Sequence, residues 1–218
     1  MALHEIRSDG EVEVIGLLTM VNAASGRVAM HGVRRVLLEA QAAALGLPLH
    51  VVELPWPCPN PLYERLMSTA MDAARLGGVS QVIFGDLFLE DIRTYREESL
   101  AGIGITPVFP LWRRSTAELA QEIVSSGIRA VITCVDPSQA PRTIAGRQYD
   151  QALLQALPEG ADPCGENGEF HTFVIDGPEF AHPLDVTIGK TAERDGFVVT
   201  DVLPAATASL GPDSSTPT

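Results

Sequence analysis

Short apolar runs alternate with amphipathic stretches along the first two thirds of the chain. Four apolar runs predict strands, at 11–21, 49–54, 82–84 and 130–135. Four longer stretches carry apolar residues at helical spacing and predict helices, at 32–45, 61–76, 90–103 and 115–127. Because parallel strands need crossover connections, this alternation predicts a parallel sheet with helices on both faces.

The pattern changes after about residue 138. A short helix at 149–156 precedes a glycine-rich segment, and three further strands are predicted at 171–175, 184–189 and 197–203. We therefore expect an α/β domain over 1–137 and a smaller α+β lobe over 138–203, packed beside the ligand edge of the sheet. The small, polar, proline-containing residues 204–218 predict a disordered tail.

Three local signals mark where helices begin and end. Ser115 and Glu118 have the spacing of a capping box. Asn60 is a candidate cap for the next helix, with Pro61 at its first position. Gly46 marks the end of the helix predicted at 32–45.

Charge and cysteine usage narrow the class of protein. The net charge of −13 argues against nucleic acid or an anionic membrane surface as the main partner. The three cysteines lie far apart without zinc-site spacing, so we expect a reducing compartment, the cytoplasm. The N-terminal residues do not resemble a secretory signal, and no apolar run approaches the length of a membrane span.

Charged residues cluster just beyond the strand at 82–84. Gly85 and Asp86 end this strand, and the following helix carries Asp91, Arg96 and Glu97. In open α/β sheets, ligands bind in the crevice at the carboxyl ends of the strands. The alternative is a solvated helix face on which Arg93 and Glu97 form an i,i+4 ion pair.

A second acid-rich segment, 162–174, reads DPCGENGEFHTFV. Glu166 and Glu169 lie three residues apart beside His171, and such carboxylates near an imidazole can bind and deprotonate ammonium as a general base, or orient an acceptor. The alternative is a glycine turn with solvated acids. Cys164 is a candidate nucleophile or metal ligand, but no partner is evident, so an inert buried thiol is the favoured interpretation.

These two motifs, in this order, resemble those of the diphthine–ammonia ligase family, a branch of the adenine nucleotide alpha-hydrolase (PP-loop ATP pyrophosphatase) superfamily. The resemblance extends from the first residues to about Asp201. It implies a Rossmann-like (HUP-type) parallel sheet and an ATP-dependent amide ligase with Mg²⁺. In that reaction a carboxylate attacks the α-phosphate of ATP, pyrophosphate leaves, and ammonia attacks the acyl-adenylate. The family's known carboxylate acceptor is a modified histidine of a translation elongation factor, and the acceptor of this chain is open.

The resemblance also implies roles for individual residues. The cofactor-binding set is Leu18, Thr19, Met30, His31, Gly85 and Asp86, with Asp86 also a Mg²⁺ ligand. The acceptor-binding set is Asp91, Arg96, Glu97, Cys164 and Gly165, and the catalytic set is Glu166, Glu169 and His171. Simpler interpretations are core packing for Met30, a structural role for His31 and a strand-end turn for Gly85 and Asp86. The implied partners are ATP, ammonia and a carboxylate acceptor, with a homodimer as one expected assembly.

One family feature is missing from this sequence. The family begins with a strand, a Ser-Gly-Gly-Lys-Asp-Ser type loop that cradles pyrophosphate, and a helix, whereas residues 1–7 resemble the middle of that helix. The absent strand would be central, so we expect a gap between the strands near Val14 and Val82. A mis-assigned start is favoured over a degenerate relative because the later motifs are intact. Without the loop, an adenine-nucleotide-binding module without catalysis is the alternative function.

Overall fold

The structure is a computed structural model, which describes residues 1–28 and 31–205. The strands are β1 (Leu17–Asn22), β2 (Arg27–Val28), β3 (Leu49–Leu54), β4 (Gln81–Ile83), β5 (Thr106–Val108), β6 (Arg129–Val135), β7 (Phe170–Asp176), β8 (Val186–Arg194) and β9 (Phe197–Pro204). The helices are α1 (Ala2–Asp9), α2 (Arg35–Leu45), α3 (Asn60–Leu76), α4 (Glu90–Leu100), α5 (Thr116–Ser125), η1 (Arg142–Ile144) and α6 (Gln151–Ala156). Within the described residues, no helix is long and apolar enough to span a bilayer.

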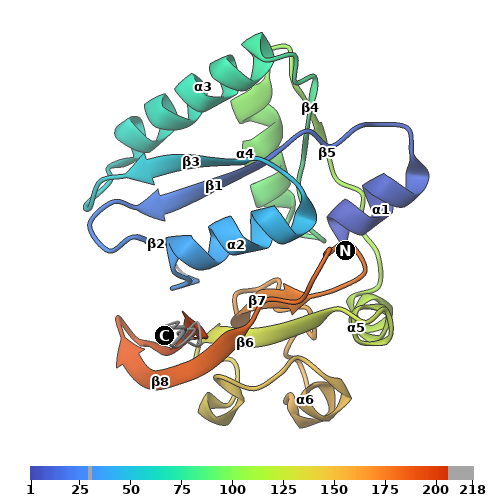
Figure 1. The fold of residues 1–218 in the computed structure, drawn as a ribbon, viewed down its shortest axis with the longest axis vertical. Helices are drawn as coiled ribbons and strands as arrows, with labels where there is room; N and C mark the ends of the chain where they lie inside the picture. Colours follow the sequence, from blue (N-terminus) through green and yellow to red (C-terminus); the bar gives the residue numbers. More distant parts are fainter. Residues whose placement is uncertain (29–30, 206–218) are drawn as a thin grey trace, which may run out of the picture.

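The predicted α/β class is confirmed, but the strands form three small sheets instead of one. β1 runs parallel to β3 and pairs with β2 only at Val21 and Asn22, while β4 pairs with β5 in a separate parallel pair. No pairing joins β1 to β4 among the described residues. The two parallel pairs lie in the upper half of the molecule in Figure 1.

The strand predicted at 130–135 was assigned to the wrong sheet. This strand, β6, pairs antiparallel with both β7 and β9, in the sheet β7-β6-β9-β8. Six consecutive buried residues follow Arg129, a pattern that is typical of a strand covered on both faces. The apolar run therefore indicated a covered strand correctly but carried no information on the direction of its neighbours.

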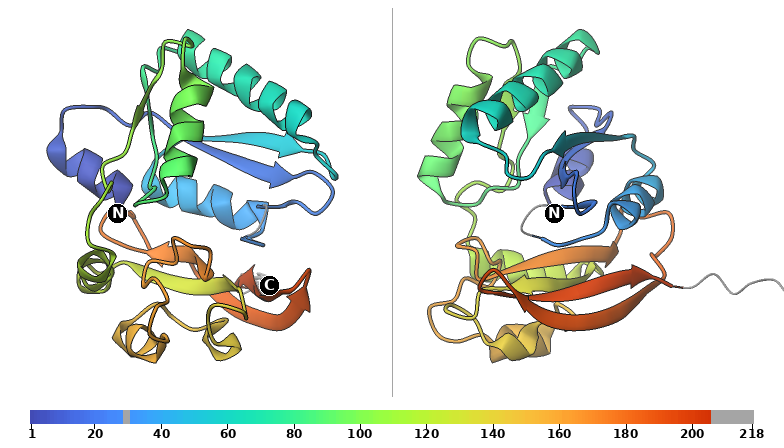
Figure 2. Two further views of the ribbon diagram at one scale, coloured as in Figure 1. Left: turned by 180° about the vertical axis from the view of Figure 1, so that it is seen from behind. Right: turned by 90° about the vertical axis from the view of Figure 1, so that its left-hand side faces the viewer.

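Both faces of this antiparallel sheet are covered by helices. On one face, Leu37 of α2 and Val33, just before this helix, pack against Val131, Phe173 and other side chains of the sheet. On the other face, α5, η1 and α6 pack over Ile132 and its neighbours. Figures 1 and 2 show α2 between the upper strands and the antiparallel sheet, so this helix joins the two halves of the molecule.

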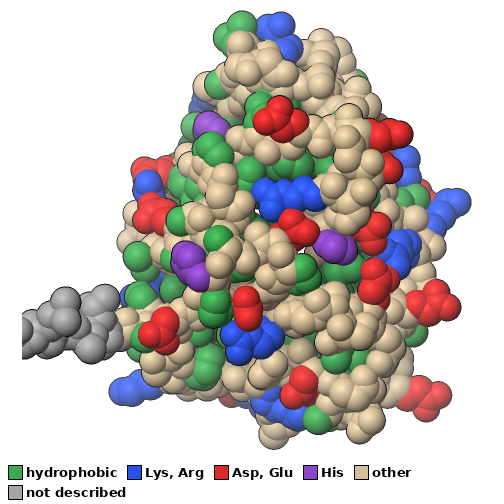
Figure 3. Space-filling model, turned by 45° about the vertical axis from the view of Figure 1, so that its right-hand side comes forward, with side chains coloured by type: hydrophobic (Ala, Val, Ile, Leu, Met, Phe, Trp, Pro, Cys, Tyr) green, Lys and Arg blue, Asp and Glu red, His purple; other side chains and the backbone are tan. Residues whose placement is uncertain are grey.

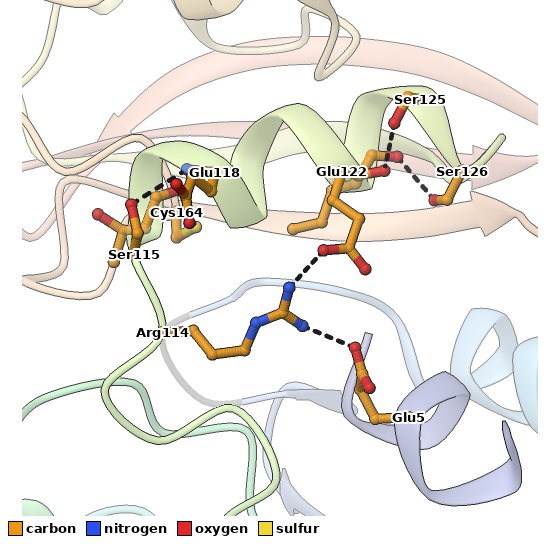
Figure 4. A network of polar contacts seen from close by, with 10 residues as sticks. Glu5, Arg114, Ser115, Glu118, Glu122, Ser125, Ser126 and Cys164 are labelled. Carbon is orange, nitrogen blue, oxygen red and sulfur yellow. Dashed lines mark hydrogen bonds and ion pairs between the residues drawn. The ribbon is translucent and has the colours of Figure 1, made fainter. Parts of the chain in front are cut away.

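Two further contacts fix the upper elements. α3 and α4 cover the β4-β5 pair through a core that contains Met71, Leu100 and Ile105. α1 is held to α5 by Arg114, which donates hydrogen bonds to Glu5 at 2.6 Å and to Glu122 (Figure 4). The first helix thus lies against the segment that leads into the antiparallel sheet.

The element boundaries test the local sequence signals. The Ser115 hydroxyl accepts the Glu118 amide at 3.4 Å, and Gly46 ends α2 in the left-handed conformation, so both signals are confirmed. The Asn60 cap is wrong, because Pro59 occupies the N-cap position of α3. The strand predicted from residue 11 begins only at Leu17, where its partner β3 begins with Leu49.

An ion-pair cluster ties the N-terminal segment to β9. Asp201 accepts hydrogen bonds from Arg27 at 2.9 Å and from Arg34 at 3.1 and 2.5 Å. Burial is the largest single influence on the Asp201 pKa and raises it, but the two arginines together outweigh burial and lower the pKa to about 2. The ion pairs of Asp201 with Arg27 and Arg34 therefore stabilise the packing of α2 on the antiparallel sheet.

Candidate functional site

The two acid-rich motifs meet at Leu87. The Leu87 amide donates a 2.7 Å hydrogen bond to Oε1 of Glu166, 79 residues later in the chain, and its carbonyl accepts the Arg113 amide at 2.7 Å. The Leu87 side chain is buried with Leu111, Leu119 and Met1. The carboxyl end of β4 is therefore held directly against the glycine-rich C-terminal loop.

The Glu166 carboxylate is half-buried, and it binds backbone amides. Burial raises the pKa of Glu166, the hydrogen bonds from the Leu87 and Phe88 amides oppose that rise, and the charges of Asp86 and Asp162 add to it. Asp86 and Glu166 consequently lie close enough to influence one another. The two acid-rich motifs, which the sequence suggested for one site, therefore lie close together in the structure.

The Asp86 carboxylate forms an ion pair with Arg96. Arg96 donates to both carboxylate oxygens of Asp86, at 2.6 and 3.2 Å, and its guanidinium lies 4.5 Å from the centre of the Phe84 ring. Such a two-point pair is strong and directional. In this arrangement each Asp86 oxygen already accepts a hydrogen bond from Arg96, and no group of three or more His, Cys, Asp or Glu side chains within residues 1–28 and 31–205 forms a metal site.

Backbone amides also organise the C-terminal loop internally. The Asp162 amide donates to Oε1 of Glu169 at 2.8 Å, and the Glu166 amide donates to Oδ2 of Asp162 at 2.8 Å. Asn167 adds a third hydrogen bond, to Oε1 of Glu169 at 3.0 Å. Glu169 is only 2% exposed, so the interpretation of these acids as solvated side chains is wrong for this residue.

Gly165 is required by the shape of the loop. Its φ is +74°, and a Cβ there would lie 2.7 Å from the Phe170 carbonyl oxygen. Gly168 has a similar φ of +86 with open space around it. Gly165 therefore faces a steric constraint that Gly168 lacks, in addition to the strain of the left-handed conformation.

This difference gives a matched prediction. Both Gly165→Ala and Gly168→Ala are expected to lower the free energy of unfolding, since both place a side chain at positive φ. The Gly165 variant should lose about 1–3 kcal/mol more, because its Cβ overlaps backbone that cannot move aside. Urea denaturation of the two variants measures the difference, and equal losses would contradict the close approach to Phe170.

His31 and His171 lie together at the junction of the two halves. Their ring centroids are 4.3 Å apart and the ring planes are inclined by 39°. Burial first, and the neighbouring His171 second, lower the pKa of His31 to about 4, and burial also lowers the pKa of His171. Two residues proposed for different roles, cofactor binding and catalysis, are thus direct neighbours.

The Cys164 thiol is shielded. It donates a 3.4 Å hydrogen bond to the Thr116 carbonyl, and Figure 4 shows it beside the start of α5. Burial, followed by the charges of Asp162 and Glu166, raises its pKa to about 12. Because the thiolate is the reactive form, this environment favours the inert thiol over a nucleophile.

Other predicted site residues are spread more widely. Leu18 and Thr19 lie in the first half of β1, and Leu18 is 40% exposed. Asp91 is exposed in the first turn of α4, and Glu97 forms the i,i+4 pair with Arg93 at 2.7 Å that the simpler interpretation gave. Met30 lies outside the described residues. The site roles of these residues stay predictions.

A cavity of about 480 Å³ lies beside the junction of the two motifs. Gly85, Leu87, Cys164 and Glu166 line it, together with residues of α1, α2, α5, β6 and β7. Its volume is in the range of small-molecule sites. Most lining side chains are apolar, and the lining includes no arginine or lysine among the described residues, so it suits an apolar or planar group better than a polyphosphate.

The central role of Glu166 gives a second prediction. Glu166→Ala should lower the free energy of unfolding by about 1–3 kcal/mol, because it leaves the buried Leu87 amide without its acceptor. Glu166→Gln should lose less, because a side-chain carbonyl oxygen replaces the carboxylate oxygen. Hydrogen exchange at the Leu87 amide measures the bond directly, and exchange that is unchanged in the alanine variant would contradict it.

Sequence reasoning missed Asp162 and Arg113. Asp162 is 8% exposed and shapes the C-terminal loop through its carboxylate, and Arg113 contributes its backbone amide. The position of Asp162 at the start of the glycine-rich motif was a usable signal, since aspartates bind nearby amides in turns. Arg113 has a positive φ of 61 and offered no such signal.

Known proteins match the chain in two ways. The family model described as the diphthamide synthase C-terminal domain matches residues 115–203. The diphthine–ammonia ligase of Bos taurus is 32% identical over 144 residues, 62% of this chain and 52% of that protein. The human diphthine–ammonia ligase is 30% identical over 131 residues, 57% of this chain and 47% of that protein.

The matched part thus spans about half the length of these mammalian relatives. The family-model match begins at the N-cap of α5 and ends within β9, so it includes the whole antiparallel sheet except the last residue of β9. It also contains the loop with Asp162, Glu166 and Glu169. Residues 115–203 are therefore similar to the diphthamide synthase C-terminal domain, and the chain is similar to about half of each of these diphthine–ammonia ligases.

Proposed function

We propose that this chain takes part in ATP-dependent amide formation of the diphthine–ammonia ligase type, in which an adenylated carboxylate is attacked by ammonia. The bond between the Leu87 amide and Glu166 is the observation that carries the proposal. It joins the carboxyl end of β4, where α/β proteins bind ligands, to the loop in the part of the chain that is similar to the diphthamide synthase C-terminal domain.

The fold offers further support for this proposal. We propose that the parallel pairs β1-β3 and β4-β5 correspond to the two sides of a Rossmann-like arrangement whose centre would lie between β1 and β4. The cavity touches both sides, through Leu17 of β1 and Gly85 after β4. We propose that the purine or acceptor part of the substrates binds against this apolar surface.

The phosphates of ATP and a Mg²⁺ ion do not fit the side chains in their present arrangement. The cavity lining lacks arginine and lysine, and Asp86 is bound to Arg96. We therefore assign no step of the reaction to a metal ion. Among this chain's own residues, Arg96 is the one whose guanidinium, if released from Asp86, would face an anionic substrate group at the end of β4.

The proposed partners are ATP, ammonia and a carboxylate acceptor that is carried on a small molecule or a protein, and self-association as a homodimer is part of the proposal. On the face that Figure 3 shows, basic and acidic side chains are interspersed over the described residues without a broad basic patch. Together with the net charge of −13, this surface disfavours nucleic acid as the acceptor.

The experiment measures AMP and pyrophosphate formation from ATP in the presence of ammonium and a panel of carboxylates, including diphthine on its elongation factor. The 218-residue chain is assayed alone and in an N-terminally extended version. Pyrophosphate release that requires both the carboxylate and ammonium supports the proposal. Absence of release from both forms, with all acceptors, would rule it out.

The hydrogen bonds already made by the carboxylates of Asp86 and Glu166 favour a second function, nucleotide binding without catalysis. Asp86 is paired with Arg96, and Glu166 is bound to backbone amides, so both acids have structural partners. This arrangement suits a nucleotide-binding module without catalysis. Saturable binding of ATP or AMP by calorimetry, without pyrophosphate release, distinguishes this function from the ligase.

A further inference from the structure

The two glutamates of the C-terminal loop have different environments. Glu166 binds the amide that follows Asp86, whereas both hydrogen bonds to the carboxylate of Glu169 go to its Oε1 atom, from Asp162 and Asn167. Oε2 of Glu169 is buried and has no hydrogen-bond partner in residues 1–28 and 31–205. A buried acceptor without a donor is costly, so this atom marks a position for a donor.

The loop also carries negative charge without a neighbouring cation. Asp162 is 8% and Glu169 2% exposed, and neither forms an ion pair with a described arginine, lysine or histidine. Their hydrogen-bond donors are neutral amides. Buried carboxylates are ordinarily paired with a cation or protonated. A small cation that donates hydrogen bonds would satisfy both the charge and the free oxygen.

We propose that Oε2 of Glu169 is the subsite for ammonium, and that Glu166 is a positioning residue that holds the Asp86 loop against the same C-terminal loop. The identity of the cation as the amine substrate rests on the proposed function. Ammonium donates directional N–H bonds, which a single carboxylate oxygen can accept. A metal ion would need several oxygen or nitrogen ligands, and the described residues do not supply such a group. Asn167, whose side-chain amide donates to Oε1 of the same carboxylate, is exposed.

The first test is the melting temperature of the 218-residue chain at pH 7 in chlorides of ammonium, potassium, sodium and tetramethylammonium at equal ionic strength. A ligand that binds only the folded state raises the melting temperature. We expect ammonium alone to do so, by about 3–6 °C at roughly ten times its Kd. Potassium resembles ammonium in size but donates no hydrogen bond, and tetramethylammonium has no N–H. An equal shift in potassium, or no difference among the four salts, would overturn the proposal without any variant.

The second test uses a matched pair of variants. Glu169→Gln keeps an acceptor for the Asp162 amide but removes the charge and places an NH₂ group at the free position, so the ammonium-specific shift should fall to about a third. Glu159→Gln makes the same chemical change at an exposed position of the same region and should keep the shift. If Glu169→Gln retains the full shift, the subsite lies elsewhere.

Activity separates this inference from the proposed function. With pyrophosphate release as the readout, Glu169→Gln should raise the KM for ammonium by about tenfold, the effect of losing one charge-assisted hydrogen bond. The KM for ATP should stay within about twofold. An ammonium-specific melting shift without pyrophosphate release supports the subsite and defeats the ligase. Pyrophosphate release with an unchanged KM for ammonium in Glu169→Gln supports the ligase and defeats the subsite.

Discussion

Replacing Leu37 by alanine is expected to lower the free energy of unfolding by about 3 kcal/mol. Leu37 is 2% exposed and packs, with Val33, against Val131 and Phe173 of the antiparallel sheet. The truncation removes apolar contacts from both halves of the molecule and leaves a cavity that a rigid sheet cannot close. Urea denaturation gives the change, with the m-value as a check that the chain still unfolds as one unit.

Leu76→Ala is the matched control for this prediction. Leu76 ends α3 and is 79% exposed, so the same truncation removes little buried surface. Its expected effect lies within about 0.5 kcal/mol. Equal losses for the two variants would show that α2 does not join the upper strands to the antiparallel sheet, and the placement of the whole C-terminal region against the N-terminal one would have to be revised.

The sequence predicted most elements because each left a local signal. The Ser115 capping box and the Gly46 helix stop depend on residues within one turn, and both are confirmed. The direction of β6 is not a local property. Its apolar run fits a parallel or an antiparallel neighbour equally well, and only β7 and β9, more than thirty residues later along the chain, decide between them.

The start of β1 shows the same limit. Residues 12–15 have a strand-like pattern, yet the strand begins at Leu17 because pairing with β3 begins there. A strand exists only where a neighbour accepts and donates its hydrogen bonds. The predicted gap between β1 and β4 agrees with the absence of pairing between them in the described residues.

For the site, the sequence identified the two motifs but not what their side chains bind. The acids of both motifs were expected to face ligands, whereas Asp86 binds Arg96 and Glu166 binds the Leu87 amide. A backbone amide has no sequence signature, so the contact between Leu87 and Glu166 was invisible before the fold was known. The pair Arg93 and Glu97 follows i,i+4 spacing and was predictable for that reason.

Acidification from pH 6.5 to 4 is expected to remove about 3 kcal/mol of stability through His31 alone. Burial and the proximity of His171 lower the pKa of His31 to about 4 in the folded state, against 6.5 in the unfolded chain. The unfolded state therefore takes up a proton over this interval while the folded state does not. The contribution is complete above pH 6.5, falls as the pH decreases to 4, and changes no further below that. His171, whose pKa burial also lowers, acts in the same direction.

The histidine contribution can be separated from that of the carboxylates. Asp201, with a pKa of about 2, loses its stabilising effect only below about pH 4. The pKa of Glu166 is raised in the folded state, so acidification increases the contribution of Glu166 to stability and opposes the effect of the histidines. Subtracting the urea-derived stability of His31→Asn from that of the wild type at each pH removes these shared effects. The difference should shrink steadily between pH 6.5 and 4, whereas the exposed-site control His182→Asn should follow the wild type across the interval. A difference that stays constant with pH would mean that His31 is as accessible to protons in the folded chain as in the unfolded one, and the buried pair with His171 would have to be abandoned.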